Sequence, residues 1–341
     1  METYTVSYGL STKKKSYRID FTGIFRYHQG MLINTGGRTD LVACYTPWLI
    51  QRFRERVVMV RNPYDHHAVS RYRLDPSVVD GVVFCSKDYR PIIPFLGEIF
   101  QRFPTYFHFT ITAYGTDIEP NVPDIPTSIH TLLELEKQVG SRRISWRYDP
   151  ILLTPTYPVQ RHLETFAQLA ETLKGHVDRC IFSFVQIYPK LRQTFPSLEA
   201  VSQSDKEHLA QGMGEIARKA GIPLQICGSD EDFSRFGILP SGCLTLPVLG
   251  RANGITFPPH PHRGMRPGCH CVESRDIGAY GTCTNGCRYC YATSDFAKAA
   301  RMRSQNNPAS PLLIGEIGPK DHITDAKQVS FGPQHQPSLF D

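Results

Sequence analysis

Short apolar segments alternate with longer amphipathic segments from about residue 31 to residue 227. The apolar segments are rich in β-branched and aromatic residues and are bounded by turn formers, which is typical of buried parallel strands. We expect seven strands: MLINT from Met31, VVMV from Val57, GVVFC from Gly81, YFHFTIT from Tyr106, RISWR from Arg143, CIFSFVQI from Cys180 and PLQIC from Pro223.

Helical patterns separate these strands. Two of them end on a glycine, at Gly140 and Gly175, and a third, SDKEHLAQGMGEIARKAGI, begins with Ser204 as a candidate N-cap. Strands that alternate with helices imply βα units and a parallel sheet. Because seven units occur without a glycine-rich nucleotide fingerprint, the pattern favours a (β/α) barrel of the TIM type over a doubly wound sheet.

Polar residues follow several of the expected strands, where a (β/α) barrel gathers its functional groups. GGRTD follows the first strand, RNPYD the second and RYDP the fifth. Asn, Asp, Gly and Pro are also ordinary turn formers, so the arginines carry more weight. Arg38, Arg61 and Arg147 are expected at the barrel mouth, where they would suit an anion or a carboxylate. The candidate catalytic residues are Arg38, Asp40, Arg147 and Asp149.

The alternation ends at residue 227. The stretch from 228 to 275 is rich in Gly, Pro and His and is predicted to be irregular, and its cysteines argue for ordering by a metal. We therefore predict three parts: a barrel over 1–227, a cysteine-rich iron–sulfur region that completes it over 228–303, and a flexible polar tail over 304–341.

The composition limits the class of protein. With 341 residues, 40% hydrophobic and 21% charged, the chain is expected to be soluble and globular. It has no apolar run long enough to span a bilayer and no secretory signal, so we expect a cytoplasmic protein without a membrane partner. The formal charge of +6 permits a polyanionic partner without requiring one.

The ten cysteines are more informative, because a dense cysteine cluster in a reducing compartment suggests metal binding or catalysis. Half of them fall between Cys269 and Cys290. Four of the others are expected to be small buried hydrophobic residues: Cys44, Cys85, Cys180 and Cys243.

The segment GTCTNGCRYCYATSD places Cys283, Cys287 and Cys290 at a C-x3-C-x2-C spacing. A structural zinc site normally has four ligands, whereas three thiolates in one loop can hold three irons of a 4Fe–4S cluster and leave the fourth open to a cofactor. Tyr289, the aromatic residue before the last cysteine, is expected beside an adenine. A helix from about Thr293 would direct its positive end toward the thiolates.

A second metal site has weaker support. Cys269 and Cys271 form a C-x-C pair and could join Cys227 on a second iron–sulfur cluster or a zinc ion. Alternative ligands are His260, His262 and His270. The other interpretation is that the pair merely precedes the main cysteine loop.

The cysteine loop resembles the signature of radical S-adenosylmethionine enzymes, and CRYCY is similar to the motif of spore photoproduct lyases and their relatives. GGRTD, RNPYD, WRYDPI and CHCVESRDIGAYGTCTNGCRYCYA resemble, over nearly the whole chain, a bacterial family known as domain of unknown function 1848. The resemblance implies a 4Fe–4S cluster and S-adenosylmethionine, reductive cleavage to a 5′-deoxyadenosyl radical, and a one-electron donor such as flavodoxin or ferredoxin. It leaves open whether the enzyme is a lyase or a transferase.

The position of the loop suggests a circular permutation. Radical S-adenosylmethionine enzymes begin with a strand, the cluster loop, a helix and a second strand whose glycine turn holds the cofactor's amino group. Here the loop lies near the end of the chain. Because the last and first strands of a closed barrel are neighbours, a barrel cut elsewhere keeps the same geometry. In that arrangement Gly36 and Gly37 lie beside the Cys283 loop as the glycine pair.

The chain ends in QPSLFD, in which Gln336, Leu339 and Phe340 match the Q-x-x-L-F pattern that docks bacterial repair proteins on the sliding clamp. Such a short pattern also arises by chance. Together with CRYCY, it favours an enzyme of DNA repair or modification, although no DNA-reading motif is present.

The sequence thus predicts a radical S-adenosylmethionine iron–sulfur enzyme that acts on DNA. One alternative is a non-catalytic zinc or iron–sulfur protein that binds DNA or a replication partner. Another is a radical S-adenosylmethionine enzyme that acts on a small anionic metabolite, which the arginines at the mouth would suit. The substrate, the consumption of the cofactor and the oligomeric state stay open.

Overall fold

The computed structural model describes residues 31–258 and 269–331 and shows an α/β fold. Its main sheet has eight strands in the order β10-β1-β4-β5-β6-β7-β8-β9, and every neighbouring pair is parallel. The bounds of these strands are β1 Leu32–Asn34, β4 Gly81–Ser86, β5 Thr105–Thr110, β6 Ile144–Ile151, β7 Arg179–Phe184, β8 Leu224–Ile226, β9 Leu239–Pro240 and β10 Arg275–Asp276.

Eight α-helices occur in the described residues: α1 Leu41–Glu55, α2 Leu96–Phe100, α3 Ile125–Val139, α4 Val159–Leu173, α5 Leu191–Thr194, α6 Gln203–Ala220, α7 Leu246–Asn253 and α8 Phe296–Ser304. None of them is long and apolar enough to cross a membrane. The glycine stops are confirmed, since Gly140 follows α3 and Gly175 follows α4, both with positive φ. The N-cap of α6 is Ser202 and not Ser204, because the Ser202 hydroxyl accepts from the Asp205 backbone N–H.

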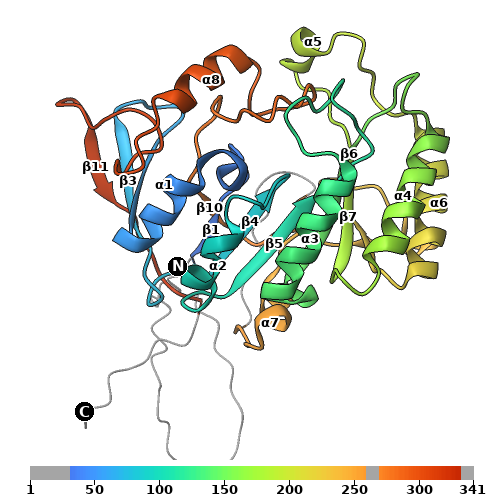
Figure 1. The fold of residues 1–341 in the computed structure, drawn as a ribbon, viewed down its shortest axis with the longest axis horizontal. Coiled ribbons are helices and arrows are strands. Elements are labelled where there is room, and N and C mark those ends of the chain that lie inside the picture. Colours follow the sequence, from blue (N-terminus) through green and yellow to red (C-terminus); the bar gives the residue numbers. More distant parts are fainter. Residues whose placement is uncertain (1–30, 259–268, 332–341) are drawn as a thin grey trace, which may run out of the picture.

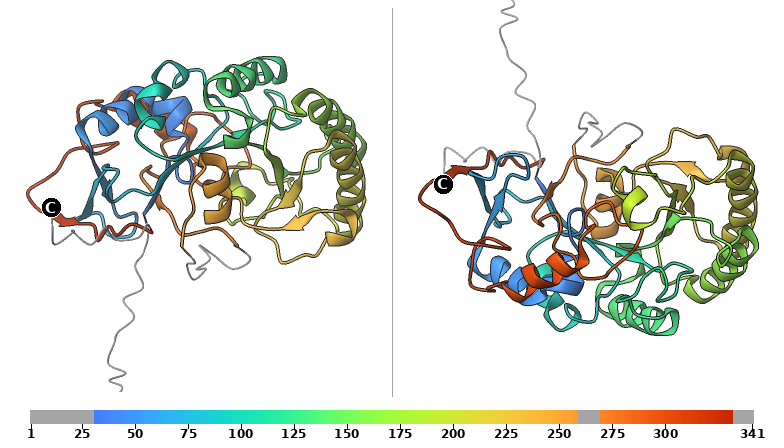
Figure 2. Two further views of the ribbon diagram at one scale, coloured as in Figure 1. Left: turned by 90° about the horizontal axis from the view of Figure 1, so that it is seen from below. Right: turned by 90° about the horizontal axis from the view of Figure 1, so that it is seen from above.

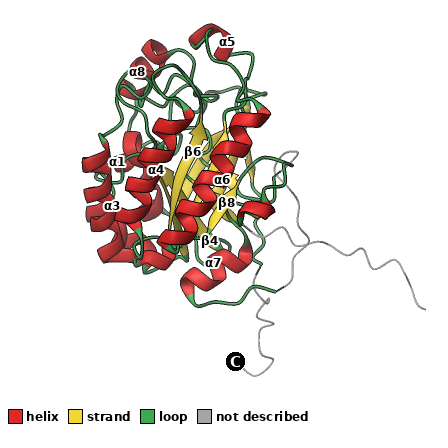
Figure 3. Ribbon diagram, turned by 90° about the vertical axis from the view of Figure 1, so that its right-hand side faces the viewer, coloured by secondary structure: helices red, strands yellow, loops and turns green. Residues whose placement is uncertain are grey.

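The sheet is curved, with most helices on its outer face and α7 on its inner face (Figures 2 and 3). Successive side chains of a strand point to opposite faces of the sheet. The sheet therefore has one hydrophobic core on its outer face and a second on its inner face. The rings of Phe84 and Phe107 stack in the outer core, with their centroids 5.0 Å apart. Leu32, Val83 and Tyr106 meet the apolar residues of α7 in the inner core. Both faces are therefore covered, as a parallel sheet requires.

A closed TIM barrel is not shown. The edges of the main sheet are β9 and β10, and no ladder joins them within the described ranges 31–258 and 269–331. The structure therefore supports the coarser class, an α/β fold with a large parallel sheet.

One expected strand lies elsewhere. VVMV forms β2, Val57–Arg61, which pairs antiparallel with β3, Ala68–Arg73, in a separate sheet completed by β11, His322–Asp325. Only Val58 of β2 is buried, so the strand has one covered face and not two. RNPYD is the hairpin turn between β2 and β3, in which the Asn62 side chain accepts from the Tyr64 backbone N–H.

The prediction that Arg61 faces the mouth of the main sheet is therefore wrong. Arg61 lies on β2 and pairs with Asp321 at 2.7 Å. Asp321 and β11 belong to segment 304–341, the segment for which the sequence predicted a tail.

Candidate active site at the carboxyl ends of the strands

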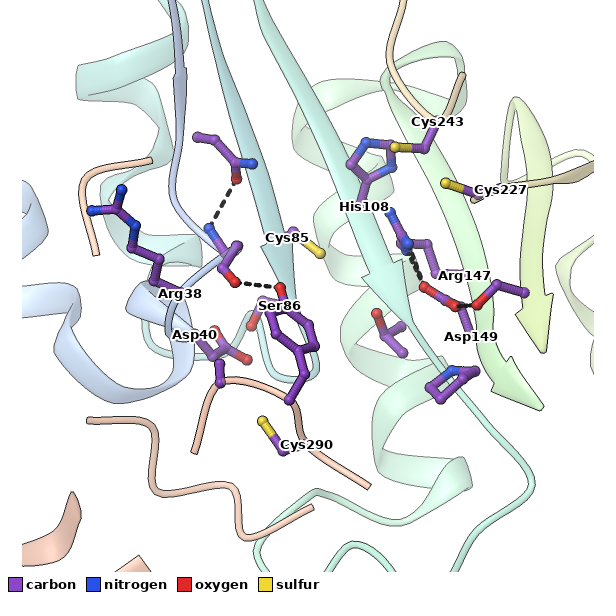
Figure 4. Close-up of a pocket in the computed structure, with 18 of the residues that line it drawn as sticks. Arg38, Asp40, Cys85, Ser86, His108, Arg147, Asp149, Cys227, Cys243 and Cys290 are labelled. Carbon is purple, nitrogen blue, oxygen red and sulfur yellow. Dashed lines mark hydrogen bonds and ion pairs between the residues drawn. The ribbon is translucent and has the colours of Figure 1, made fainter. Parts of the chain in front are cut away.

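A cavity of about 430 Å³ lies at the carboxyl ends of the strands of the main sheet (Figure 4). It is lined from β1, β4, β5, β6 and β7, from the segment after β8, and from the cysteine loop that follows β10. The sequence-predicted residues that line it are Gly36, Gly37, Arg38, Asp40, Arg147, Asp149, Cys227, Cys269, Cys271, Cys283, Cys287, Tyr289 and Cys290. The predicted partner residues Gln336, Leu339 and Phe340 lie outside the described residues.

The turn after β1 and the cysteine loop after β10, which lie far apart in the sequence, build one wall of this cavity. β10 pairs with β1 in parallel, with Asn34 opposite Asp276. The cysteine loop leaves β10, and the turn containing Gly36 and Gly37 leaves β1, so both emerge at the same edge of the sheet. The Asp276 carboxylate accepts from the Gly37 backbone N–H at 2.6 Å, and the Tyr291 hydroxyl donates to the Gly37 carbonyl oxygen.

Both glycines are required by close approach. A Cβ on Gly36 would overlap the carbonyl oxygen of Cys85 in β4, and a Cβ on Gly37 would lie 2.6 Å from the Asp276 carboxylate. Only glycine lets the backbone come this close to its neighbours. The turn is therefore held tightly against β4 and Asp276, beside the cysteine loop.

The three motif cysteines line the cavity without forming a compact group. Cys287 is buried, and Cys283 and Cys290 are partly exposed. In the part of the chain that the structure describes, their sulfur atoms do not meet within the 4.8 Å that a single ion would need. Thiolates that bind different irons of a cluster stand farther apart than thiolates on one ion, so the motif cysteines do not form a single-ion site in this structure. Burial raises the pKa of Cys287, so a cationic centre is needed to hold its thiolate.

A buried network holds Tyr289 in place. Glu119 is only 3% exposed, and one of its oxygens accepts from Lys87 Nζ at 2.8 Å, from Thr112 Oγ1 at 2.9 Å and from the Tyr289 hydroxyl. Burial alone would lower the pKa of Lys87, but the charge and hydrogen bond of Glu119, together with the charges of Cys287 and Asp149, outweigh it and the pKa is raised. No sequence motif marks Glu119, so its part in this network is visible only in the fold.

Asp40 forms hydrogen bonds to α1, to the residue after β4 and to the cysteine loop. Its carboxylate caps α1 through the Ala43 N–H at 2.9 Å and accepts from the Lys87 N–H and the Asn285 side chain, both at 3.0 Å. Burial raises its pKa. These contacts fix the cysteine loop, which contains Asn285, against α1 and the end of β4.

Arg147 and Asp149 form an ion pair on the cavity wall, and the Ser183 hydroxyl donates to Asp149. Both side chains are largely buried, at 14% and 16% exposure. Burial would raise the pKa of Asp149, but the charge and hydrogen bond of Arg147, together with the hydrogen bond from Ser183, outweigh it and the pKa is lowered. Arg38 lies over the Tyr280 ring at 5.6 Å. The charge of Arg147 at the cavity wall is therefore paired with Asp149 and is not free to bind an anion.

A compact cysteine group lies apart from the motif loop, on another part of the cavity (Figure 4). The sulfur atoms of Cys227, Cys243 and Cys271 lie within 4.8 Å of one another, and this group could hold a metal. Cys269 contacts Cys271 and lines the same cavity. The sequence predicted Cys227, Cys269 and Cys271 as a second site.

Cys243, which was expected to be a small buried hydrophobic residue, is partly exposed and belongs to this compact group. Cys243 lies far from Cys271 in sequence and belongs to no ligand-spacing motif, so only the fold brings the two together. Of the alternative ligands, His260 and His262 lie outside the described residues, and His270 is not a member of the compact group.

Comparison with known proteins gives one match. A family model described as Domain of unknown function (DUF1848) matches residues 32–292, a range that contains both the glycine turn and the cysteine motif. No curated protein and no solved structure matches the chain.

Proposed function

The chain belongs to the family described as Domain of unknown function (DUF1848), and we propose that it is a radical S-adenosylmethionine enzyme on a circularly permuted (β/α) barrel. The observation that carries the proposal is the adjacency of the cysteine loop and the Gly36–Gly37 turn, which leave neighbouring parallel strands and line one cavity. The family match names no activity, so the proposal rests on this geometry and on the donor chemistry.

Different residues of the cavity would bind the cluster and the cofactor. Cys283, Cys287 and Cys290 would hold three irons of a 4Fe–4S cluster, and the backbone carbonyl oxygens of Gly36 and Gly37 would accept from the amino group of S-adenosylmethionine. Reduced by a donor such as flavodoxin or ferredoxin, the bound cofactors would supply a 5′-deoxyadenosyl radical.

The remaining side chains position groups and exclude water. Tyr289 is anchored by Glu119, which keeps its ring on the cavity wall where an adenine would lie. Arg147, Asp149 and Ser183 form a polar patch on the same wall, suited to orient a substrate. The catalytic roles of Arg38 and Asp40 stay proposals, since the contacts of Asp40 are with the protein itself.

The cavity volume favours a small substrate. About 430 Å³ lies in the range of small-molecule sites and cannot admit an intact duplex. If the substrate is DNA, the reacting nucleotide must leave the base stack. A small metabolite is the second candidate, although the pairing of Arg147 with Asp149 weakens the case for an anionic one.

The test is reductive cleavage by anaerobically reconstituted protein. We expect the full chain with a strong reductant to convert S-adenosylmethionine to 5′-deoxyadenosine, quantified by liquid chromatography. Cys290→Ala should abolish this, while Cys180→Ala, a buried cysteine of β7 outside the cavity, should retain it. Stoichiometric zinc without cleavage would instead support the alternative of a non-catalytic metal protein that binds DNA or a replication partner.

A further inference from the structure

The compact group of Cys227, Cys243 and Cys271 has the geometry of a site for one ion. We propose that these three thiolates, with His108 as the fourth ligand, bind a single divalent transition-metal ion, for which zinc is best suited. This inference is independent of the cluster proposed at the Cys283 loop.

The sulfur separations favour one ion over a cluster. In a tetrahedral zinc site, bonds of about 2.3 Å place the sulfur atoms about 3.8 Å apart. The three sulfur atoms here lie within 4.8 Å of one another, and Cys243 and Cys271 are 2.9 Å apart. Thiolates on separate irons of a cluster would be spread wider, as the cysteines of the motif loop are.

The fold gathers these cysteines from three distant places. Cys227 follows β8, Cys243 precedes α7, and Cys271 precedes β10. Cys227 and Cys271 are each 8% exposed, so the group is largely shielded from water. Deprotonated thiols this close repel one another, and a bound cation removes that repulsion.

His108 is a fourth donor of the right kind, but its ring nitrogens do not lie within 4.8 Å of all three sulfur atoms, so the ring would have to move closer as the ion binds. It lies on β5, is 3% exposed, and its Nδ1 lies 2.5 Å from Ser145 Oγ. Its Nε2 is buried and has no hydrogen-bond partner within residues 31–258 and 269–331. Figure 4 shows the ring beside the Cys243 sulfur. If the Ser145 hydroxyl accepts from Nδ1–H, Nε2 carries the free lone pair that a metal requires, which is the usual arrangement for a ligating histidine.

A bound ion would stabilise the region between the edge strands β9 and β10 of the main sheet. β9 and β10 do not pair in the described residues, and the three cysteines come from segments on either side of that gap. An ion bound to them and to His108 would hold α7 against the inner face of the sheet. A closed Cys₃His set, with no position left for water, is typical of structural zinc.

Metal counting on the full chain tests the proposal. We expect wild-type protein purified from zinc-supplemented cells to contain one zinc per chain by mass spectrometry, and Cys243→Ala to lose that equivalent. The matched control Cys180→Ala should keep it. Cys290→Ala should also keep the zinc while losing cluster iron, which separates this proposal from the proposed function. Unchanged zinc in Cys243→Ala, or loss of iron and sulfide instead, would overturn the single-ion site.

A Co²⁺ spectrum tests the site on wild-type protein, so the proposal stays testable if Cys243→Ala does not fold. Wild-type protein loaded with Co²⁺ should show the visible bands of tetrahedral thiolate coordination. His108→Ala should shift these bands and weaken Co²⁺ binding by at least tenfold, as Cys269→Ala should not. A spectrum that responds to Cys269→Ala and not to His108→Ala would refute His108 as the fourth ligand.

Discussion

Individual charged and polar side chains around the cavity find their partners inside the protein. Glu119 accepts from Lys87, Thr112 and Tyr289, and Asp40 accepts from groups on three elements. These contacts place the cysteine loop and its aromatic residue at fixed positions on the cavity wall. The acidic residues are therefore part of the support of the site, whatever they do in a reaction.

Buried His162 predicts how the stability depends on pH. Its Nδ1 lies 2.9 Å from the Tyr148 hydroxyl and its Nε2 lies 2.9 Å from the Leu152 carbonyl oxygen, and burial lowers its pKa to about 4. The unfolded chain, with a pKa of about 6.5 at this group, binds the proton more readily. His162 therefore contributes stability above about pH 6.5 that is lost as the pH falls toward 4.

Urea unfolding at a series of pH values measures this effect. We expect His162→Gln to be less stable than wild type near pH 7 and to lose less stability between pH 6.5 and 4. The difference in slope should approach about 1.4 kcal/mol per pH unit. Parallel curves for the two proteins would show that His162 does not remain neutral in the fold.

At the scale of single elements, the end of β1 is constrained by its neighbour β4. Gly36→Ala would push a methyl group into the Cys85 carbonyl oxygen, which is backbone and cannot rotate away. We expect this variant to lose about 1–3 kcal/mol of unfolding free energy. Gly97→Ala is the matched control: it lies in α2 with no atom within 4 Å of the added Cβ, and should gain about 0.5–1 kcal/mol. Equal stability of the two variants would contradict the packing of β1 on β4.

The same elements show what the sequence could predict. Strands buried on both faces leave continuous apolar runs, so most strands of the main sheet were recognisable. β2 has a similar run although only one of its faces is covered, and β9 and β10 are two residues long and leave no pattern. The motif cysteines were found from local spacing. Cys243 and Glu119 join their sites only through long-range folding, which spacing cannot report.

At the scale of the whole molecule, the first strand of the described chain pairs with the last strand that the chain contributes to the main sheet. β10 and β1 pair at one edge of the sheet, so a cysteine loop late in the sequence meets a glycine turn early in it. A cut at a different point of a barrel explains this order without any change of geometry. The compact cysteine group contains Cys227, which follows β8, and Cys271, which precedes β10, so it brings together segments near the two edges of the sheet.

The C-terminal segment carries a separate prediction about partners. We expect the full chain to be retained on an immobilised bacterial sliding clamp and Phe340→Ala to reduce that retention by at least tenfold, because Phe340 would be one of two apolar anchors of the docking motif. Ser338→Ala, which lies between the motif residues, should bind as wild type does. Equal retention of the Phe340 variant would remove the link to replication and leave the small-metabolite interpretation stronger.

In the proposed function, the cysteine loop and the Gly36–Gly37 turn hold one cluster and its cofactor in one site. Electron paramagnetic resonance of the reduced, anaerobically reconstituted chain tests it most directly. We predict the signal of a 4Fe–4S cluster that shifts when S-adenosylmethionine is added and is lost in Cys290→Ala. A cluster signal that S-adenosylmethionine leaves unchanged, or a protein that incorporates no cluster through these cysteines, would contradict the account.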